Sequence, residues 1–379
     1  MERGGVGMAR AGLGAALTVL AVAGAAVVVP AAASAANARG FNSPGNVLIA
    51  DQSNGRVIEV TPKGQIVWHF GRGPNMCDAS SIVGTNDTQR VGKLTLMAGT
   101  GVPLGADVLH PGFSCTDNRV LLVNEDGKIV WRYGQFGVTG SGPNELSVPV
   151  QDTFLPNGDV LITDQSNERI IEVKPSKTGV GGTIVWQYGT TGVAANPADP
   201  EANQLNNPNS AELLPNGHVL IADENDNRAI EVVPNRSTGV GGTIVDTWTG
   251  VIHGVALSGV AFASRLPNGH TLITDSNNAR IVEVDRHHAF VWQYVTNTQA
   301  GSNANPLPTR GVRLADGDTL ISDQYNHRVI EVTRDGDIVR QLGHLNAPGF
   351  GTTSTQQGLN GPYDAKVIGD YTGLTPPTR

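Results

Sequence analysis

The segment Leu161-Ile-Thr-Asp-Gln-Ser-Asn-Glu-Arg-Ile-Ile-Glu-Val173 decides the fold, because close copies of it recur along the chain. In each clear copy an Arg follows the Asp by five residues, and a Glu follows the Arg by three. The clear copies carry their Asp at Asp51, Asp164, Asp223, Asp275 and Asp323. A degenerate copy with a shortened turn spans residues 116–121. An apolar run, a polar turn and a β-branched run predict a β-hairpin for every copy.

Two further strands accompany each hairpin. One follows it with the pattern Ile-Val-Trp, in which Trp68, Trp131, Trp186 and Trp292 share one position, while Trp248 stands two residues later. We expect these tryptophans to be packing anchors between sheets. The other strand precedes the hairpin and usually begins with Pro. We place its copies at residues 103–109, 149–155, 208–214, 260–266, 308–314 and 362–368.

The repeat therefore has four strands, and its length suits a propeller blade better than a helical solenoid. The two ends of the propeller sequence each contain only part of a repeat. Residues 46–71 supply the second to fourth strands without a first, whereas residues 362–368 form a first strand without partners. The two sets balance if the C-terminal strand completes the N-terminal blade, which also removes an open sheet edge. We predict an all-β, six-bladed β-propeller closed in this way.

The stretch Asp323-Gln-Tyr-Asn-His-Arg-Val329 resembles the NHL repeat, and residues 41–371 follow that family's blade pattern. The resemblance implies a six-bladed propeller. It does not single out a function, since the family includes protein- and RNA-binding scaffolds, sensor domains, and lyases or hydrolases. The Gly-x-Ile-Val-Trp-x-Tyr strands are also similar to arylsulfotransferase and quinoprotein propellers. The first of these implies a catalytic His in the channel, but no predicted first strand carries one there, and nothing in the sequence supports a quinone cofactor.

Composition and the N-terminus limit the partners and the compartment. The 379 residues carry a formal net charge of −8 and no run of Lys or Arg, so a nucleic-acid partner is not expected. Arg3 and Arg10 precede an apolar stretch at 11–29 and small residues near 33–38, which predicts a signal peptide over residues 1–35 or, alternatively, an uncleaved membrane anchor. The expected location is secreted or extracytoplasmic. The cysteines, Cys77 and Cys115, then favour a disulfide over two free thiols.

The repeated Asp and Arg look like catalytic pairs, but a pair repeated around a ring is expected to be structural. Function is expected where the blades differ, on the first strands that line the axial channel. The polar residues there that we single out as ligand-binding candidates are Gln151, Asp152, Asn209, Ser210, Thr309, Arg310, Tyr363 and Asp364. Arg310 and Asp364 hold equivalent positions in neighbouring blades, so they either form an inter-blade salt bridge or bind an anionic ligand.

Other features are assigned less specific roles. His110, His253 and His344 lie in connecting segments and are weak candidates for a metal site; no cofactor is predicted, although zinc or calcium stays open. The Gly-rich stretches 178–183 and 238–243 lie between strands and are expected to be hairpin loops rather than nucleotide-binding loops. Residues 72–102 are predicted to form a long loop before blade two, and residues 372–379 a disordered tail.

The hypothesis that follows is an exported, monomeric propeller that acts as a binding scaffold for an unknown protein, peptide or carbohydrate. It needs no catalytic residue, and any membrane contact would run through an uncleaved N-terminus. The alternative is an extracytoplasmic propeller lyase or hydrolase with a metal ion in the axial channel, which requires several His, Asp or Glu side chains to converge there.

Overall fold

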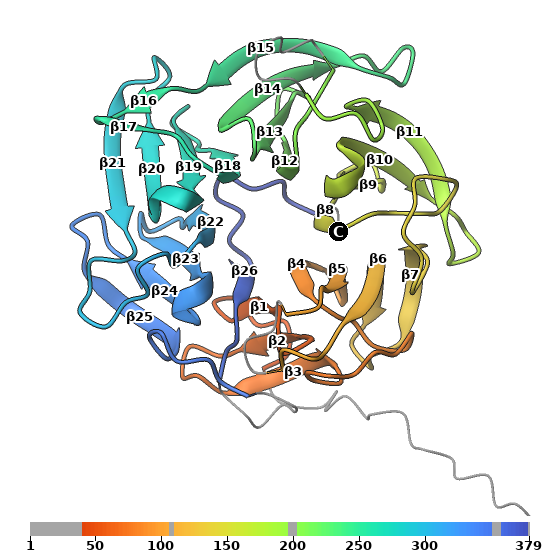
Figure 1. Ribbon diagram of the computed structural model, residues 1–379, viewed down its shortest axis with the longest axis horizontal. Coiled ribbons are helices and arrows are strands. Elements are labelled where there is room, and N and C mark those ends of the chain that lie inside the picture. The colour runs from red at the N-terminus through yellow and green to blue at the C-terminus, as the bar shows by residue number, and fades with distance from the viewer. Residues whose placement is uncertain (1–39, 106–109, 196–202, 351–357, 378–379) are drawn as a thin grey trace, which may run out of the picture. The chain divides into compact units, whose positions relative to one another are not determined.

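The computed structural model of the protein describes residues 40–105, 110–195, 203–350 and 358–377, and the predicted signal segment lies outside them. Six four-stranded antiparallel sheets follow one another around a central axis as the blades of a propeller (Figure 1). The first strands of successive blades are neighbours all the way round the ring. The predicted fold class is therefore confirmed.

Each blade runs outward from its first strand at the axis. Blade 1 comprises β26 (Pro362–Val367), β1 (Val47–Asp51), β2 (Arg56–Val60) and β3 (Ile66–Gly71). Blade 2 comprises β4 (Thr85–Val91), β5 (Leu94–Val102), β6 (Cys115–Asn124) and β7 (Ile129–Gly134). Blade 3 comprises β8 (Pro149–Phe154), β9 (Val160–Asp164), β10 (Arg169–Pro175) and β11 (Gly182–Tyr188).

The second half of the ring has the same order. Blade 4 comprises β12 (Pro208–Leu213), β13 (Val219–Asp223), β14 (Arg228–Pro234) and β15 (Gly242–Trp248). Blade 5 comprises β18 (Val260–Arg265), β19 (Thr271–Asp275), β20 (Arg280–Val284) and β21 (Phe290–Val295). Blade 6 comprises β22 (Pro308–Arg313), β23 (Thr319–Asp323), β24 (Arg328–Val332) and β25 (Ile338–Gly343). A small hairpin, β16 (Val251–Ile252) and β17 (Val255–Ala256), precedes blade 5. Three single 3-10 turns are η1 (Gln165–Asn167), η2 (Ser276–Asn278) and η3 (Gln324–Asn326).

The ring closes where the ends of the chain meet. Strand β26 pairs antiparallel with β1, with Val47 opposite Val367 and Ile49 opposite Ala365. Apolar side chains of blades 6 and 1 pack between the two sheets, among them Val329. Similar buried clusters fill the other five inter-blade spaces. Since burial of one Val or Ile contributes about 1.5–3 kcal/mol, the six interfaces hold the ring together.

The repeated Asp and Arg are structural, as expected. Arg169 Nε donates to Asp164 Oδ2 at 2.8 Å, and both side chains are buried. The other oxygen of Asp164 accepts the backbone N–H of Ser147 at 2.8 Å, just before β8. The same Asp–Arg pairing recurs in blades 1, 4, 5 and 6. Each pair therefore ties the end of the second strand both to the third strand and, in most blades, to the entry of the first.

The tryptophan anchors and the Gly-rich loops join neighbouring blades. The indole N–H of Trp186 donates to the carbonyl of Gly241 in blade 4 at 3.0 Å, and three other tryptophans make equivalent bonds to the next blade. The Gly-rich loops connect β10 to β11 and β14 to β15, as expected. Each reaches the outer strand of the preceding blade, where Val180 forms a bridge with Arg132 and Val240 with Gln187. They thus cover the outer edges of β7 and β11.

Blade 2 departs from the prediction. Its first strand is β4, so the placement at residues 103–109 is wrong; 103–105 form no strand, and 106–109 lie outside the described residues. The predicted loop at 72–102 is also wrong, because β4 and β5 occupy much of it. The cause is a rearranged motif: Gly99 stands where the other blades have Asp, and the carboxylate comes instead from Asp117.

Asp117 makes the contacts that the repeated Asp makes in the other blades. It pairs with Arg119, and its Oδ2 accepts the backbone N–H of Val83 at 2.8 Å. The connection between β5 and β6 is correspondingly long, and the predicted disulfide Cys77–Cys115 is present at its base, with a Cα–Cα distance of 5.6 Å.

The C-terminal segment is ordered, which corrects the expected tail at 372–379 for residues 372–377; the last two lie outside the described residues. Leu374 is buried and packs against Phe262 and Val312 on two first strands. Figure 1 shows this segment crossing the middle of the ring after β26. Among the described residues, no helix has the length and apolarity needed to cross a membrane.

The rearranged motif of blade 2 predicts that the residue shared by the other blades is destabilising at position 99. Gly99→Asp restores the residue of the other blades, yet a Cβ at position 99 would lie 2.6 Å from Asp117 Oδ2. We expect the variant to lose about 1–3 kcal/mol of unfolding free energy through overpacking, measured by chemical denaturation. An unchanged or higher stability would contradict the assignment of Asp117 as the substitute.

Candidate functional site

The axis of the propeller is filled at its centre by Arg310 of β22, which is buried. Its guanidinium donates to Asn209 Oδ1 of blade 4 at 3.1 Å and approaches the carbonyl of Val150 in blade 3 at 3.4 Å. The rings of Phe262 and Tyr363 lie 5.1 and 5.4 Å from its guanidinium carbon. The side chain thus reaches from blade 6 to the opposite side of the ring, held by hydrogen bonds and cation–π contacts.

The C-terminal segment closes the end of the axis at which β26 finishes. Thr375 is buried there, and its backbone N–H donates to Glu212 Oε2 at 2.8 Å. Its carbonyl accepts Gln89 Nε2 at 3.1 Å. Because Glu212 and Gln89 belong to different first strands, the segment bridges the opening. Among the described residues, a hollow opens at the other end of the axis, where the repeated Asp residues lie.

The open end is a bowl lined by carboxamides. The residue directly after the repeated Asp faces it as Gln52, Gln165, Glu224 and Gln324, in blades 1, 3, 4 and 6. The bowl has a volume of about 360 Å³. Its other lining residues are Ser53, Asn86, Thr100, Gly101, Val102, Pro103, Val148, Asn207, Tyr325 and Tyr363. We call this the carboxamide bowl. Its size falls within the range of small-ligand sites.

One side of the bowl is a neutral hydrogen-bonded arc. Gln324 Nε2 donates to Gln52 Oε1 at 2.9 Å, and Gln52 Nε2 donates to Asn86 Oδ1 at 2.7 Å. Thr100 Oγ1 approaches the same Asn86 oxygen at 3.3 Å. A primary amide has two N–H donors and an acceptor oxygen with two lone pairs. The arc therefore holds its members in place and leaves part of their capacity for a ligand.

The opposite side converges on Glu224. Its Oε2 accepts Asn209 Nδ2 at 2.8 Å, and Gln165 Nε2 and Asn207 Nδ2 at 3.3 Å each. Burial raises the pKa of Glu224, whereas the amide of Asn209 and the charge of Arg310 below oppose that rise. The carboxylate is thus anchored as a hydrogen-bond acceptor on the wall of the bowl.

Tyr363 forms part of the floor. Its hydroxyl accepts Asn209 Nδ2 at 2.8 Å. Burial, followed by the nearby charge of Glu224, raises the pKa of this phenol well above its usual value. The hydroxyl therefore stays protonated and remains a donor at physiological pH.

Deeper along the axis lies a buried axial cluster of Asp87, Asp152, Asp364 and Lys366. Lys366 Nζ lies 2.8 Å from Asp87 Oδ1 and 2.6 Å from Asp364 Oδ2. Neither carboxylate oxygen of Asp152 has a hydrogen-bond partner among the described residues. Burial and the charge of Asp87 raise the pKa of Asp152 well above its usual range. Burial also raises the pKa of Asp364 to about 7, although Lys366 opposes the shift.

The candidates chosen from the sequence divide between these levels. Asn209, Arg310 and Tyr363 meet at the floor of the bowl, whereas Asp152 and Asp364 belong to the axial cluster. Arg310 Nε and Asp364 Oδ1 stand 4.0 Å apart, at the limit of an ion pair. Two of the others bond to neighbouring strands: Gln151 donates to Glu212 at 3.0 Å, and Thr309 donates to the carbonyl of Tyr363 at 2.5 Å. The Ser210 hydroxyl is buried without a hydrogen-bond partner among the described residues.

Residues that the sequence did not single out complete both levels. Asn86 and Asp87 were missed because the first strand of blade 2 was placed too late in the chain. The ring of Gln52, Gln165 and Gln324 was overlooked because these residues belong to the repeat. The sequence did contain a sign of their role: the Asp of the repeat is the same in these blades, whereas the residue after it is Glu in blade 4 and Ser in blade 5.

The histidine candidates lie in different surroundings. His110 packs against Phe350, His253 stacks on Phe290 with centroids 3.9 Å apart, and His344 follows β25. Among the described residues, the grouping with metal-ligand spacing is Asp316, Asp318 and Glu331.

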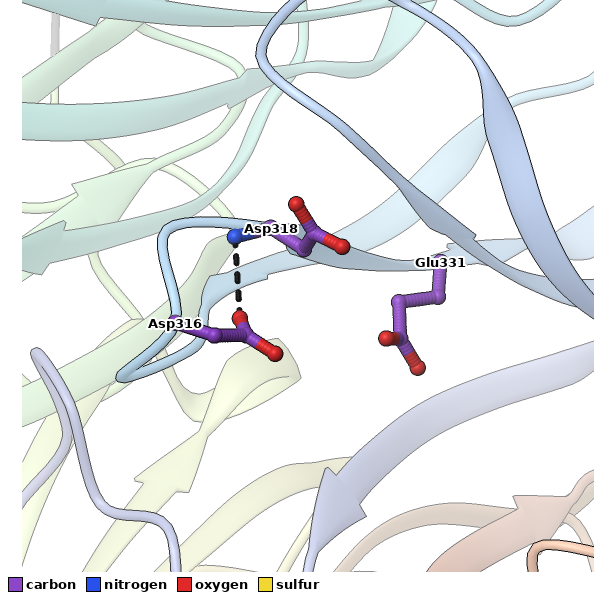
Figure 2. Close-up of side chains that lie close together, drawn as sticks. All are labelled: Asp316, Asp318 and Glu331. Atoms are coloured by element: carbon purple, nitrogen blue, oxygen red, sulfur yellow. Dashed lines mark hydrogen bonds between the residues drawn. The ribbon is translucent and has the colours of Figure 1, made fainter.

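Figure 2 shows Asp316 and Asp318 at the turn between β22 and β23, where Asp318 N donates to Asp316 Oδ1 at 3.0 Å, and Glu331 on the neighbouring strand β24. The turn is at the opposite end of the blade from the bowl, and its acids are exposed or half-buried. Exposed acids of this kind do not by themselves define a metal site.

The fold and the bowl define the protein as a six-bladed β-propeller with one open axial end. No protein-family model matches the sequence, and no curated protein matches it. A protein of unknown function from Bacteroides caccae has a TM-score of 0.52 at 16% identity, covering 79% of this chain and 93% of that chain. The periplasmic gluconolactonase PpgL of Pseudomonas aeruginosa has a TM-score of 0.53 at 10% identity, covering 86% and 99%.

A streptogramin B lyase structure has a TM-score of 0.49 at 13% identity and covers 82% of this chain and 88% of that chain. At identities this low the likeness to the Bacteroides caccae protein and to PpgL shows the propeller fold alone.

The axial cluster predicts a pH dependence of stability. The pKa of Asp364 is about 7 in the folded protein and about 4 when unfolded. The folded state therefore holds an extra proton between these values, and stability falls as pH rises from about 4 to 7, by at most about 1.4 kcal/mol per pH unit for this group. Asp364→Asn should flatten that slope in denaturation series across this range. Asp337→Asn, at an exposed turn acid, should leave it unchanged; equal slopes in all three proteins would contradict the assignment.

Proposed function

We propose that this chain is an exported, NHL-like propeller that acts as a binding scaffold, with the carboxamide bowl as its ligand site. The observation that carries the proposal is the form of the axis. Arg310 and the segment around Thr375 fill or close it from below, so the bowl is a concave site with one entrance. Hydrogen-bonding side chains from five blades line that entrance, and a site with fixed polar groups in a hollow is typical of small-ligand recognition.

Binding fits the state of Glu224 better than catalysis does. Among the described lining residues Glu224 supplies the carboxylate. Three amide donors converge on one of its oxygens. Such an oxygen is held as an acceptor and is poorly placed to take a proton from a substrate. The lyase or hydrolase alternative would also need converging metal ligands; the described residues do not gather His110, His253 and His344 into such a group, and in the axial cluster Asp87 and Asp364 pair with Lys366.

Export is supported by the basic, apolar and small-residue pattern of residues 1–35 and by the disulfide, which suits an oxidising compartment. We expect protein recovered from the extracytoplasmic fraction of its host to lack the first 35–38 residues and to have no free thiol before reduction. Intact mass and thiol alkylation measure both. A full-length, reduced protein in the cytoplasmic fraction would refute export without bearing on the bowl.

The bowl itself is tested by ligand-induced thermal shifts against a chemically mixed library of sugars, nucleosides, amino acids and short peptides. We expect ligands that stabilise the wild type to have an effect at least tenfold weaker in Gln324→Leu, because that change breaks the neutral arc at its first member. The matched control is Gln65→Leu, at an exposed glutamine near the opposite end of blade 1. If every ligand acts equally on the two variants, the bowl is not the binding site.

A further inference from the structure

We infer that the ligand of the carboxamide bowl is a neutral saccharide, recognised through its hydroxyl groups; this inference rests on the proposed function. The first reason is charge. Among the described lining residues Glu224 is the carboxylic acid, and no Lys or Arg faces the hollow. An anion would meet a carboxylate with no exposed cation to offset it, so phosphates, sulfates and acidic sugars are disfavoured.

The buried guanidinium below does not change this argument. The two terminal nitrogens of Arg310 donate to Asn209 and to the carbonyls of Ala261, Thr309 and Val150, and its buried Nε stands 4.0 Å from Asp364 Oδ1 in the axial cluster. It is covered by Tyr363, whose ring lies 5.4 Å from the guanidinium carbon. Its charge supports Glu224 from beneath the floor and is not presented to a ligand.

The second reason is the match between carboxamides and hydroxyls. A sugar hydroxyl donates one hydrogen bond and accepts others, and a carboxamide side chain does both as well. Within the described residues, the carboxamide oxygens of Gln165 and Gln324 accept no hydrogen bond from the protein. They stand on opposite sides of the bowl, in blades 3 and 6, so acceptors are available around the ligand rather than along one line.

The third reason is the combination of an aromatic ring with this polar wall. Tyr325 lines the bowl and keeps 37% of its surface exposed. An exposed tyrosine offers an apolar face to the C–H face of a pyranose and a hydroxyl to its edge. Glu224 provides the charged acceptor, which makes a stronger hydrogen bond to a hydroxyl than a neutral one does. A compact ring with hydroxyls on its whole edge satisfies these groups together, whereas an extended peptide would call for a groove.

The test uses the purified protein on an array of neutral mono- to tetrasaccharides with their sulfated, sialylated and amino counterparts, followed by calorimetry on each positive. We expect at least one neutral saccharide to bind with an affinity that changes less than twofold between low and high salt. Its acidic counterpart should bind at least tenfold more weakly. Glu224→Gln, which keeps the shape and removes the charge, should weaken the neutral saccharide about tenfold.

Two controls separate this inference from the proposed function. Gln65→Leu should bind the saccharide like the wild type, and Gln324→Leu should weaken it. If the mixed library yields a ligand that depends on Gln324 but no neutral saccharide binds, the inference is overturned and the binding site stands. Exclusive binding of an amino sugar, abolished by salt and by Glu224→Gln, would also overturn it in favour of a cationic ligand. If no ligand depends on Gln324, both fail.

Discussion

The antiparallel pairing of β26 with β1 is the contact on which the rest of the structure depends. It joins the two ends of the propeller chain and turns a row of sheets into a ring. The core between blades 6 and 1 includes residues of both paired strands, such as Ile49 and Ala365, and without the pairing β1 would present an open edge. The axial residues are gathered by the same contact, since β26 itself carries Tyr363, Asp364 and Lys366.

The ring then gives its axis two unlike ends. The bonds of Arg310 to Asn209 and to backbone carbonyls occupy the middle, and Thr375 fastens the chain end across one opening. What stays open is the end where the second and third strands turn. The buried Asp–Arg pairs hold these turns, and the residue that follows each Asp differs between blades, as Gln, Glu or Ser. The structural Asp and a lining residue of the bowl thus lie one position apart in the same motif.

Much of the architecture could be predicted from the sequence because the same strand pattern recurs in most blades. The Asp-to-Arg spacing, the tryptophans and the unpaired terminal strands together specified six blades and their closure. Blade 2 could not be predicted in this way. Asp117 supplies the carboxylate in place of Gly99, and the two residues are distant in sequence but close in space. The site was harder still. Strand position identified Asn209, Arg310 and Tyr363, but the bowl also uses Gln52, Gln165 and Gln324, whose repetition made them look purely structural.

The position of β26 after the other strands of the propeller has a consequence for how the ring forms. A chain in synthesis has the strands of five complete blades and of a three-stranded blade 1 until β26 has followed. Until then β1 has an unpaired edge and the floor of the bowl lacks Tyr363. The open edge can pair with strands of other chains. Strand β26 therefore completes the propeller, and only a chain that includes it can form the closed ring.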